Sequence, residues 1–368
     1  MPWRAGDRVG EGKTAGVETR KRGKAGPLFP TILVSALLAL LALVFLTRSD
    51  GLAGPVRVWL ADERGVGSIA FSPDGALLAS GGWDGTVKVW DRASGRLLRT
   101  LRGPRRSVMT VTFSPDGKVI AATSEDTTVT RWEAHTGRVI RPLLYHHGFA
   151  HGLAYTPDGK LLASSGHSDT TVTLWEAHTG KAVRRLTGHS AWSGAVAVYP
   201  DGTRLASGDR EGVRLWEVAT GKPLRVLPGP TTHWLAFSAD GALLAHGGSY
   251  TRANLCDART GRLRHVLPEK AVHAAAFSPD GKWLATGSRG TLSLWDPATA
   301  QRREVLAGKR PPAPWRARLL AWLGRAFPAF FRPEPPPDIR AVAFSPDGRW
   351  LAASSDKKVV LWHVPERR

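Results

Sequence analysis

Apolar and polar positions recur in one order through most of the chain. A short apolar run precedes a Pro-Asp-Gly turn, a second apolar run follows it, and a third run, reached through a polar loop, ends in Trp. Runs of this length, bounded by Gly, Pro, Asp and Ser, are typical of β-strands joined by tight turns. The pattern therefore predicts an all-β fold made of many short strands.

The turn sets the period of the pattern. Phe-Ser-Pro-Asp-Gly and its close variants occur at 71–75, 113–117, 155–159, 198–202, 237–241, 277–281 and 344–348. Successive copies lie 42, 42, 43, 39, 40 and 67 residues apart, measured between their Asp residues. Pro presets φ for such a turn and Gly accepts a positive φ, so each copy is expected to join two antiparallel strands.

The third apolar run of each copy closes on Trp and, in most copies, on an acidic residue. These runs lie at 86–91, 128–133, 171–176, 212–217, 291–296 and 359–363, and the fifth copy has Cys256 in place of the Trp. A fourth run, such as 95–101, usually follows. Four strands in roughly 40 residues, with Trp-Asp closing the third, resemble the WD40 family. The resemblance covers 56–368 and implies a seven-bladed β-propeller.

The two ends of the repeat region predict how the ring closes. The seventh copy stops after its third strand, at 361–363, and lacks a fourth. Residues 55–60, which precede the first turn, align with fourth strands of other copies such as 97–101. We therefore expect this N-terminal strand to complete the last blade, which would remove an exposed sheet edge.

The resemblance also implies a buried hydrogen-bond network, made by a Gly-His pair before the first strand, a loop Asp and the Trp. Only Gly188-His189 matches the pair. The loop Asp is present as Asp84, Asp126, Asp169 and Asp356, whereas the fourth copy offers Glu211 and the sixth Arg289. We expect the blades to be braced unequally.

The N-terminal residues differ from the repeats in their hydropathy. Residues 28–46 are apolar and uncharged, and at ~1.5 Å per residue such a helix approaches the ~30 Å hydrocarbon thickness of a bilayer. Seven Lys or Arg precede the run, and only Arg48 and Asp50 follow it closely. The positive-inside rule therefore predicts a single-pass protein with a cytoplasmic N-terminus and its propeller on the outer side.

The predicted organisation has four parts: a basic cytoplasmic tail over 1–27, a transmembrane helix over 28–47, a linker over 48–55 and the propeller over 56–368. The alternative is a signal peptide cleaved near Ala53, which would make the protein secreted. The Ala-, Arg- and Gly-rich composition is typical of a GC-rich bacterial genome, so the membrane would be an inner membrane and the propeller periplasmic or exported.

Composition narrows the classes of chemistry. The net charge of +20 favours acidic partners. The one cysteine permits neither an intrachain disulfide nor a Cys-rich zinc site. Trp is abundant at 15 residues, but six of them stand at one repeat position, which favours a core role over nucleic-acid binding. We expect no nucleic-acid partner.

No catalytic, cofactor or metal constellation is apparent. His146, His147 and His151 cluster where the Gly-His pair would fall, without an acidic or thiol partner spaced for a metal, which favours a structural or solvated role. The seven acidic turns stand one per blade, which favours turns over calcium ligands. We expect no enzyme activity, no cofactor and no metal.

The long spacing before the seventh turn contains an insertion at 309–338. Pro-rich ends bracket a short helical candidate with aromatic and Leu residues on one face and Arg318, Arg325 and Arg332 opposite. Such a helix suits a membrane surface, but the tether would enter from the other face of the ring, so docking onto the propeller or a partner is the favoured interpretation.

These features predict a membrane-anchored scaffold that presents loops to a protein or peptide partner. The candidate contact residues are non-repeated aromatic and Arg side chains, the types enriched at binding hot spots. They are Trp83, Arg105, Arg106, Tyr145, Trp192, Trp315 and Trp322. Two alternatives stay open: an enzyme or cofactor-binding propeller with a site on the central axis, and a sensory or assembly subunit that couples across the membrane.

Overall fold

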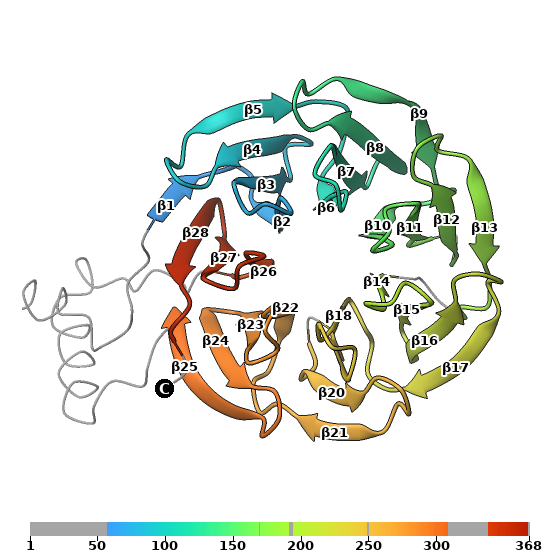
Figure 1. Ribbon diagram of the computed structural model, residues 1–368, viewed down its shortest axis with the longest axis vertical. Coiled ribbons are helices and arrows are strands. Elements are labelled where there is room, and N and C mark those ends of the chain that lie inside the picture. Colours follow the sequence, from blue (N-terminus) through green and yellow to red (C-terminus); the bar gives the residue numbers. More distant parts are fainter. Residues whose placement is uncertain (1–56, 169, 191–193, 249, 308–337, 367–368) are drawn as a thin grey trace, which may run out of the picture. The chain divides into compact units, whose positions relative to one another are not determined.

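The computed structural model describes residues 57–366 apart from 169, 191–193, 249 and 308–337. Its regular structure in this part of the chain is all β, in seven four-stranded antiparallel sheets. Figure 1 shows the sheets arranged around one axis as the blades of a propeller. The predicted all-β, seven-bladed fold is confirmed.

The first four blades take their strands from consecutive parts of the sequence, ordered from the axis outward. Blade one has β2 (Val66–Phe71), β3 (Leu77–Gly82), β4 (Val87–Asp91) and β5 (Leu97–Leu101). Blade two has β6 (Val108–Phe113), β7 (Val119–Ser124), β8 (Thr128–Glu133) and β9 (Val139–Tyr145). Blade three has β10 (Ala150–Tyr155), β11 (Leu161–Gly166), β12 (Val172–Glu176) and β13 (Ala182–Leu186). Blade four has β14 (Val196–Val198), β15 (Arg204–Asp209), β16 (Gly212–Glu217) and β17 (Pro223–Pro228).

The last three blades follow the same order, except that the outer strand of the seventh comes from the start of the repeat region. Blade five has β18 (Trp234–Phe237), β19 (Leu243–Gly247), β20 (Asn254–Asp257) and β21 (Leu263–Val266). Blade six has β22 (Val272–Phe277), β23 (Leu284–Ser288), β24 (Thr291–Asp296) and β25 (Gln301–Ala307). Blade seven has β26 (Val342–Phe344), β27 (Trp350–Ser355), β28 (Lys358–His363) and β1 (Arg57–Leu60).

The pairing of β1 with β28 confirms the predicted closure. The register runs from Arg57 opposite Leu361 to Leu60 opposite Lys358. The indole of Trp59 then lies 5.9 Å from that of Trp90, between ring centroids, and so links blade seven to blade one. Because the two ends of the repeat region share one sheet, the ring has no sheet edge left open at its seam.

Each Pro-Asp-Gly turn is held by its own side chains. In blade one the Ser72 hydroxyl donates to the Asp74 carboxylate at 2.5 Å, and the same carboxylate accepts from the Ala76 N–H at 3.0 Å. The Ser72 hydrogen bond, followed by that of Ala76, lowers the pKa of Asp74. Gly75 has a φ of +68°, which explains Gly at this position. These contacts support the interpretation of the acidic segments as turns.

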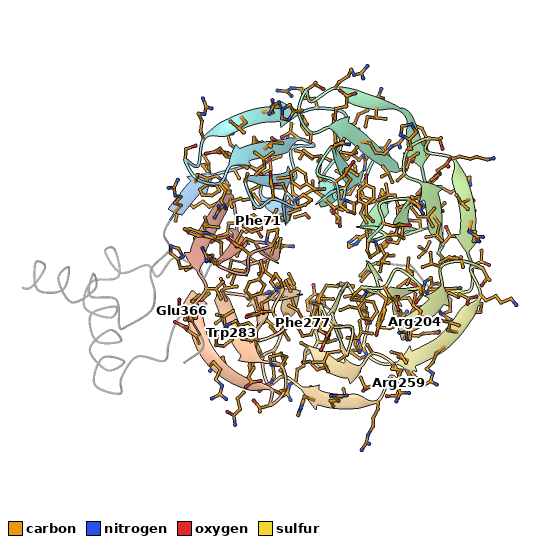
Figure 2. The ribbon with its side chains drawn as sticks, in the orientation of Figure 1. Phe71, Arg204, Arg259, Phe277, Trp283 and Glu366 are labelled. Atoms are coloured by element: carbon orange, nitrogen blue, oxygen red, sulfur yellow. The ribbon has the colours of Figure 1, made fainter. Side chains whose placement is uncertain are left out.

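The core lies between the blades. One cluster joins Leu174 of blade three and Leu186 of the same blade to Trp216 of blade four, and similar clusters follow around the ring. The largest fully buried side chains include three of the repeated Trp residues. Figure 2 shows Phe71 and Phe277 near the axis and Arg259 on the circumference. The repeated Trp is thus a core residue.

Four predicted segments lie outside the described residues: the tail over 1–27, the helix over 28–47, the linker over 48–55 and nearly all of the insertion over 309–338. Within the part of the chain that the structure describes, no helix is long and apolar enough to cross a bilayer. At the end of the insertion, Asp338 forms an isolated bridge with Arg289 of blade six.

Candidate functional site

One face of the ring carries two loops from every blade, and we call it the loop face. The first loop joins an outer strand to the next inner strand, and the second joins the second and third strands of a blade. The two loops touch: the Trp83 N–H donates to the Gly65 carbonyl at 2.9 Å, and the His167 N–H donates to the Phe149 carbonyl at 2.7 Å. All Pro-Asp-Gly turns lie at the opposite end of the strands, on what we call the turn face.

Trp83 lies on the loop face of blade one and is half-buried. A Cβ on Gly65 would lie 2.8 Å from its Cε3, and a Cβ on Gly67 would lie 2.9 Å from its Nε1. The indole therefore occupies space that only glycine leaves open on the neighbouring backbone. This packing fixes the ring and leaves part of it exposed.

A cation covers the Trp83 ring. The Arg340 guanidinium lies 4.8 Å from the ring centroid, and it also pairs with Asp338 at 2.7 Å. Asp338 in turn lies 3.1 Å from Nε2 of His273. A cation–π contact at an exposed site contributes ~0.5–1 kcal/mol. The contacts join blades one, seven and six on one surface.

Arg105 and Arg106 lie beside this group and are exposed. The Arg105 N–H donates to the Asp126 carboxylate at 2.6 Å, which holds the loop in place. A Cβ on Gly85 would lie 3.1 Å from the Arg106 carbonyl oxygen, so the two loops pack closely. The structure therefore brings three of the predicted contact residues, Trp83, Arg105 and Arg106, into neighbouring loops.

The other candidates are distributed differently. Tyr145 ends β9 at the loop face and is 55% exposed. Trp192, Trp315 and Trp322 lie outside the described residues. Two further aromatic residues are exposed on this face, Phe149 at 43% and Tyr250 at 83%, and neither was among the predicted contacts. Neither aromatic residue has a counterpart in the same loop position of the other repeats, which is the signal that could have identified them.

The histidines near the axis bear on the alternative of an axial site. His151, His233 and His273 hold the same repeat position as Gly67 and Arg340, four residues before the start of each turn segment. In β10 and β22 a β-bulge lies at this position, and bulges redirect side chains. Three histidines from three blades therefore stand at the axial end of the loop face.

His151 is held by the neighbouring blade. Its Nδ1 lies 3.0 Å from the Gly194 carbonyl, and its ring centroid lies 6.4 Å from that of His167. Burial lowers the pKa of His151 to about 4, so its ring is neutral at pH 7. Among the described residues, no three His, Cys, Asp or Glu side chains converge in a way that could hold a metal ion.

His146 belongs to the core of blade three. Its Nε2 lies 2.7 Å from the Ser164 hydroxyl, which also accepts from the Trp175 indole N–H at 2.7 Å. His146 is buried, so the structural interpretation of this residue agrees with its contacts.

Blade four has the full network that the resemblance implied. His189 Nδ1 lies 2.7 Å from Asp209, and its Nε2 lies 2.8 Å from Ser207, which accepts from the Trp216 indole at 2.7 Å. The acid is therefore Asp209 rather than Glu211, since the loop begins at the end of β15. Glu211 instead contacts Arg214 at the surface, at 3.3 Å.

Blade six has an acid in its network although none was expected at its loop position. Arg289 stands in its loop, but Glu269, from the preceding connection, accepts from Thr286 at 2.6 Å and from Ser288 at 2.7 Å. The Trp295 indole donates to Thr286 at 2.7 Å, which completes the network. Glu269 thus replaces the histidine, and blade six is braced without a loop acid.

Comparison with known proteins agrees with this architecture. The family described as "WD domain, G-beta repeat" matches residues 54–91, 95–133, 137–176, 180–217, 261–296 and 333–363. The matched segments leave out 218–260, which contains Cys256 in the position of the repeated Trp.

Curated relatives match over about one repeat. "Ribosome assembly protein 4" of Chaetomium thermophilum is 40% identical over 45 residues, 12% of this chain and 9% of that protein. "Small ribosomal subunit protein RACK1z" of Arabidopsis thaliana is 51% identical over 47 residues, 12% of this chain and 14% of that protein. "Small ribosomal subunit protein RACK1" of Brassica napus matches equally. The chain thus spans only 9% to 14% of the length of these relatives.

Proposed function

Because the chain belongs to the WD40 family, whose propellers bind protein partners, we propose that it is a membrane-anchored scaffold whose loop face binds an acidic protein or peptide segment. The observation that carries this proposal is the group formed by Trp83, Arg340, Arg105 and Arg106. Trp and Arg are the residue types enriched at binding hot spots. Here they combine a fixed aromatic ring with three exposed cations.

Charge supports an acidic partner. The chain has a net charge of +20, so its field attracts acidic segments before contact. Asp338 neutralises part of the charge of Arg340, whereas Arg105 and Arg106 are exposed in the neighbouring loop. A carboxylate that approaches Trp83 would therefore meet the Arg340 guanidinium over the ring and two further cations in that loop.

The relatives' names do not extend the proposal to the ribosome. Two of them are named as ribosomal subunit proteins and one as a ribosome assembly protein, but each match covers a single repeat. A match of that length covers the strand pattern of one blade and not the loop face of the whole ring. We therefore carry over protein binding and no particular partner.

The anchor is the second part of the proposal. Residues 28–46 are uncharged and apolar, with a basic segment before them, which favours a cytoplasmic N-terminus and a propeller on the outer side. Alkaline carbonate washing of membranes should leave the full chain in the pellet and release a variant lacking 28–46. Release of the full chain, or a mature N-terminus just after Ala53, would contradict the anchor.

Proximity labelling in the host membrane tests the loop face. A peroxidase fused to the C-terminus of the full chain would be compared in three forms: wild type, Trp83→Ala with Arg340→Ala, and the turn-face control Lys118→Ala with Lys160→Ala. Loss of a hot spot costs ~2 kcal/mol or more, so labelling of the partner should fall at least ~10-fold only in the loop-face variant. Equal labelling in all three forms would overturn the proposal.

A further inference from the structure

Six blades bury an indole at the same place in their third strand. These residues are Trp90, Trp132, Trp175, Trp216, Trp295 and Trp362. In blade five the position is held by Cys256, which pairs with Leu244 as Trp216 pairs with Leu205. The backbone register is the same, so the exchange removes an indole without moving the strand.

The residue that usually receives the indole hydrogen bond has changed as well. In blades one, three, four and six it is Ser80, Ser164, Ser207 and Thr286. In blade five it is His246, whose Nε2 lies 3.6 Å from the Cys256 sulfur and whose Nδ1 lies 3.2 Å from the Thr232 hydroxyl. Blades two and seven have Ala122 and Ala353 there and keep their Trp, so only blade five lacks the indole.

The imidazole occupies part of the vacant space. A Cβ on Gly188 would face Cη2 of Trp216 at 3.8 Å, whereas a Cβ on Gly229, its counterpart, would face Cε1 of His246 at 3.2 Å. An imidazole is one ring smaller than an indole, so the rest of the space stays open. We call the remaining space the blade-five slot.

The blade-five slot is a cavity of about 270 Å³ between β17 and blade five. Cys256 and His246 form its inner end, and its walls include Leu227 and Leu263. Figure 1 shows β17 and β21 next to each other on the circumference, and Figure 2 places Arg259, from the turn beside the slot, on the outside of the ring. The slot therefore opens at the rim, away from the loop face.

The inner end of the slot is uncharged. Cys256 and His246 are 4% and 2% exposed. Burial raises the pKa of the Cys256 thiol to about 11 and lowers the pKa of His246 to about 4. At neutral pH the pair is therefore a thiol and a neutral imidazole, which suits an apolar or aromatic group and not thiolate chemistry.

The mouth of the slot is cationic. Arg225 and Arg262 line it, and both are exposed. Arg225 donates to the Thr260 carbonyl, which holds its guanidinium over the turn beside the slot. The neighbouring Asp257 is already paired with Arg264, so it does not neutralise these two guanidinium groups. The slot thus combines an aromatic-sized apolar interior with two cations at its entrance.

We propose that the blade-five slot is a second binding site, which takes an aromatic side chain from an acidic segment of a partner protein. Six equivalent positions filled by indole show that an aromatic ring packs at this place between blades, and Arg225 and Arg262 favour carboxylates beside a ring that enters the space left by His246. The cavity is smaller than the ~300–1,000 Å³ of drug-sized ligand sites, so it holds one side chain. The site is independent of the loop face.

Titration calorimetry of the full chain in detergent with indole-3-acetate tests the site, since this probe joins an indole to a carboxylate. Saturable binding to the wild type is expected. Arg225→Ala with Arg262→Ala should weaken it at least ~10-fold, because the carboxylate of the probe loses both of its charged partners. The matched control is Arg184→Ala with Lys222→Ala, the equivalent pair beside the filled site of blade four, and it should leave binding unchanged.

A second variant fills the slot. Cys256→Trp with His246→Ser restores the residues of blade four and should abolish binding of the probe. Protection of the only cysteine from alkylation by iodoacetamide gives an independent readout on the wild type, where the probe should slow the reaction. Absence of saturable binding, or equal binding by the wild type and the Arg225/Arg262 variant, would overturn the proposal.

Discussion

Blades four and five share strand order and register. They differ in the side chains that fill the space between the third strand and the preceding blade. In blade four, Trp216 packs against Leu186 and donates to Ser207, and His189 joins the network to Asp209. The corresponding cluster of blade five contains Leu227, Leu244 and Ala258 without an aromatic ring from the third strand.

The difference shows which parts of a blade the fold requires. The Asp of the turn and its hydroxyl donor are kept in both blades, since Thr203 donates to Asp201 at 2.6 Å in blade four and Ser238 donates to Asp240 at 2.6 Å in blade five. The indole is not kept, although it is one of the largest buried groups elsewhere. Because neighbouring blades on both sides hold the strands, a single blade can lose its Trp and gain a cavity.

The largest expected difference between the two blades is the loss of stability when the side chain at the repeated Trp position is truncated. Trp216→Ala should lower the free energy of unfolding by ~3–5 kcal/mol, since it leaves a cavity and removes the indole N–H that donates to Ser207. Cys256→Ala removes one small buried group and should cost about 1 kcal/mol or less. Denaturant unfolding of both variants checks this. Similar losses of unfolding free energy for the two variants would show that blade five is as well packed as blade four at this position.

Acid should destabilise the folded chain through blade five, because the buried His246 is neutral there. Its folded pKa of about 4 lies below the unfolded value of about 6.5, so the unfolded state binds the proton first. The stability that the neutral ring contributes is therefore present above pH 6.5 and lost as the pH falls toward 4, by about 3 kcal/mol in total. His246→Asn should flatten the stability curve in this window. An unchanged slope would contradict the buried, neutral state.

The smallest effect comes from making blade five like blade four. Cys256→Trp with His246→Ser fills the slot and supplies the hydroxyl that receives the indole N–H. Filled cavities commonly add ~0.5–2 kcal/mol, so the melting temperature should rise by a few degrees. The single change Cys256→Trp is the control, since His246 would then compete for the same space. A fall in stability for the double variant would mean that the slot is not shaped for an indole.

Much of the fold could be predicted from short-range patterns. The seven turns determine the number of blades, and the unmatched strand at 56–60 predicts the closure, because both depend on local sequence and counting. The acidic residues that complete the buried hydrogen-bond networks could not be predicted in the same way. Asp209 and Glu269 act from different loops, and only the folded chain shows which acid reaches a given Ser or Thr.

The candidate sites also contain residues that the sequence pattern identifies and residues that only the fold brings together. Trp83, Arg105 and Arg106 could be selected as non-repeated hot-spot types, and the structure brings them together. Arg340 could not be paired with Trp83, since 257 positions separate them in the sequence and the closure of the ring makes them neighbours. Cys256 was visible as an exception, but the cavity depends on how much space His246 takes.

Site-specific photo-cross-linking tests the central claim, that the loop face binds the partner. A photoreactive residue would replace Arg105, Phe149 or Tyr250 on the loop face, or Lys118, Lys160 or Lys282 on the turn face, in the full chain in its host membrane. We expect a shared protein adduct from loop-face positions and none from turn-face positions. Adducts from the turn face alone, or none from Arg105, would contradict binding at the loop face.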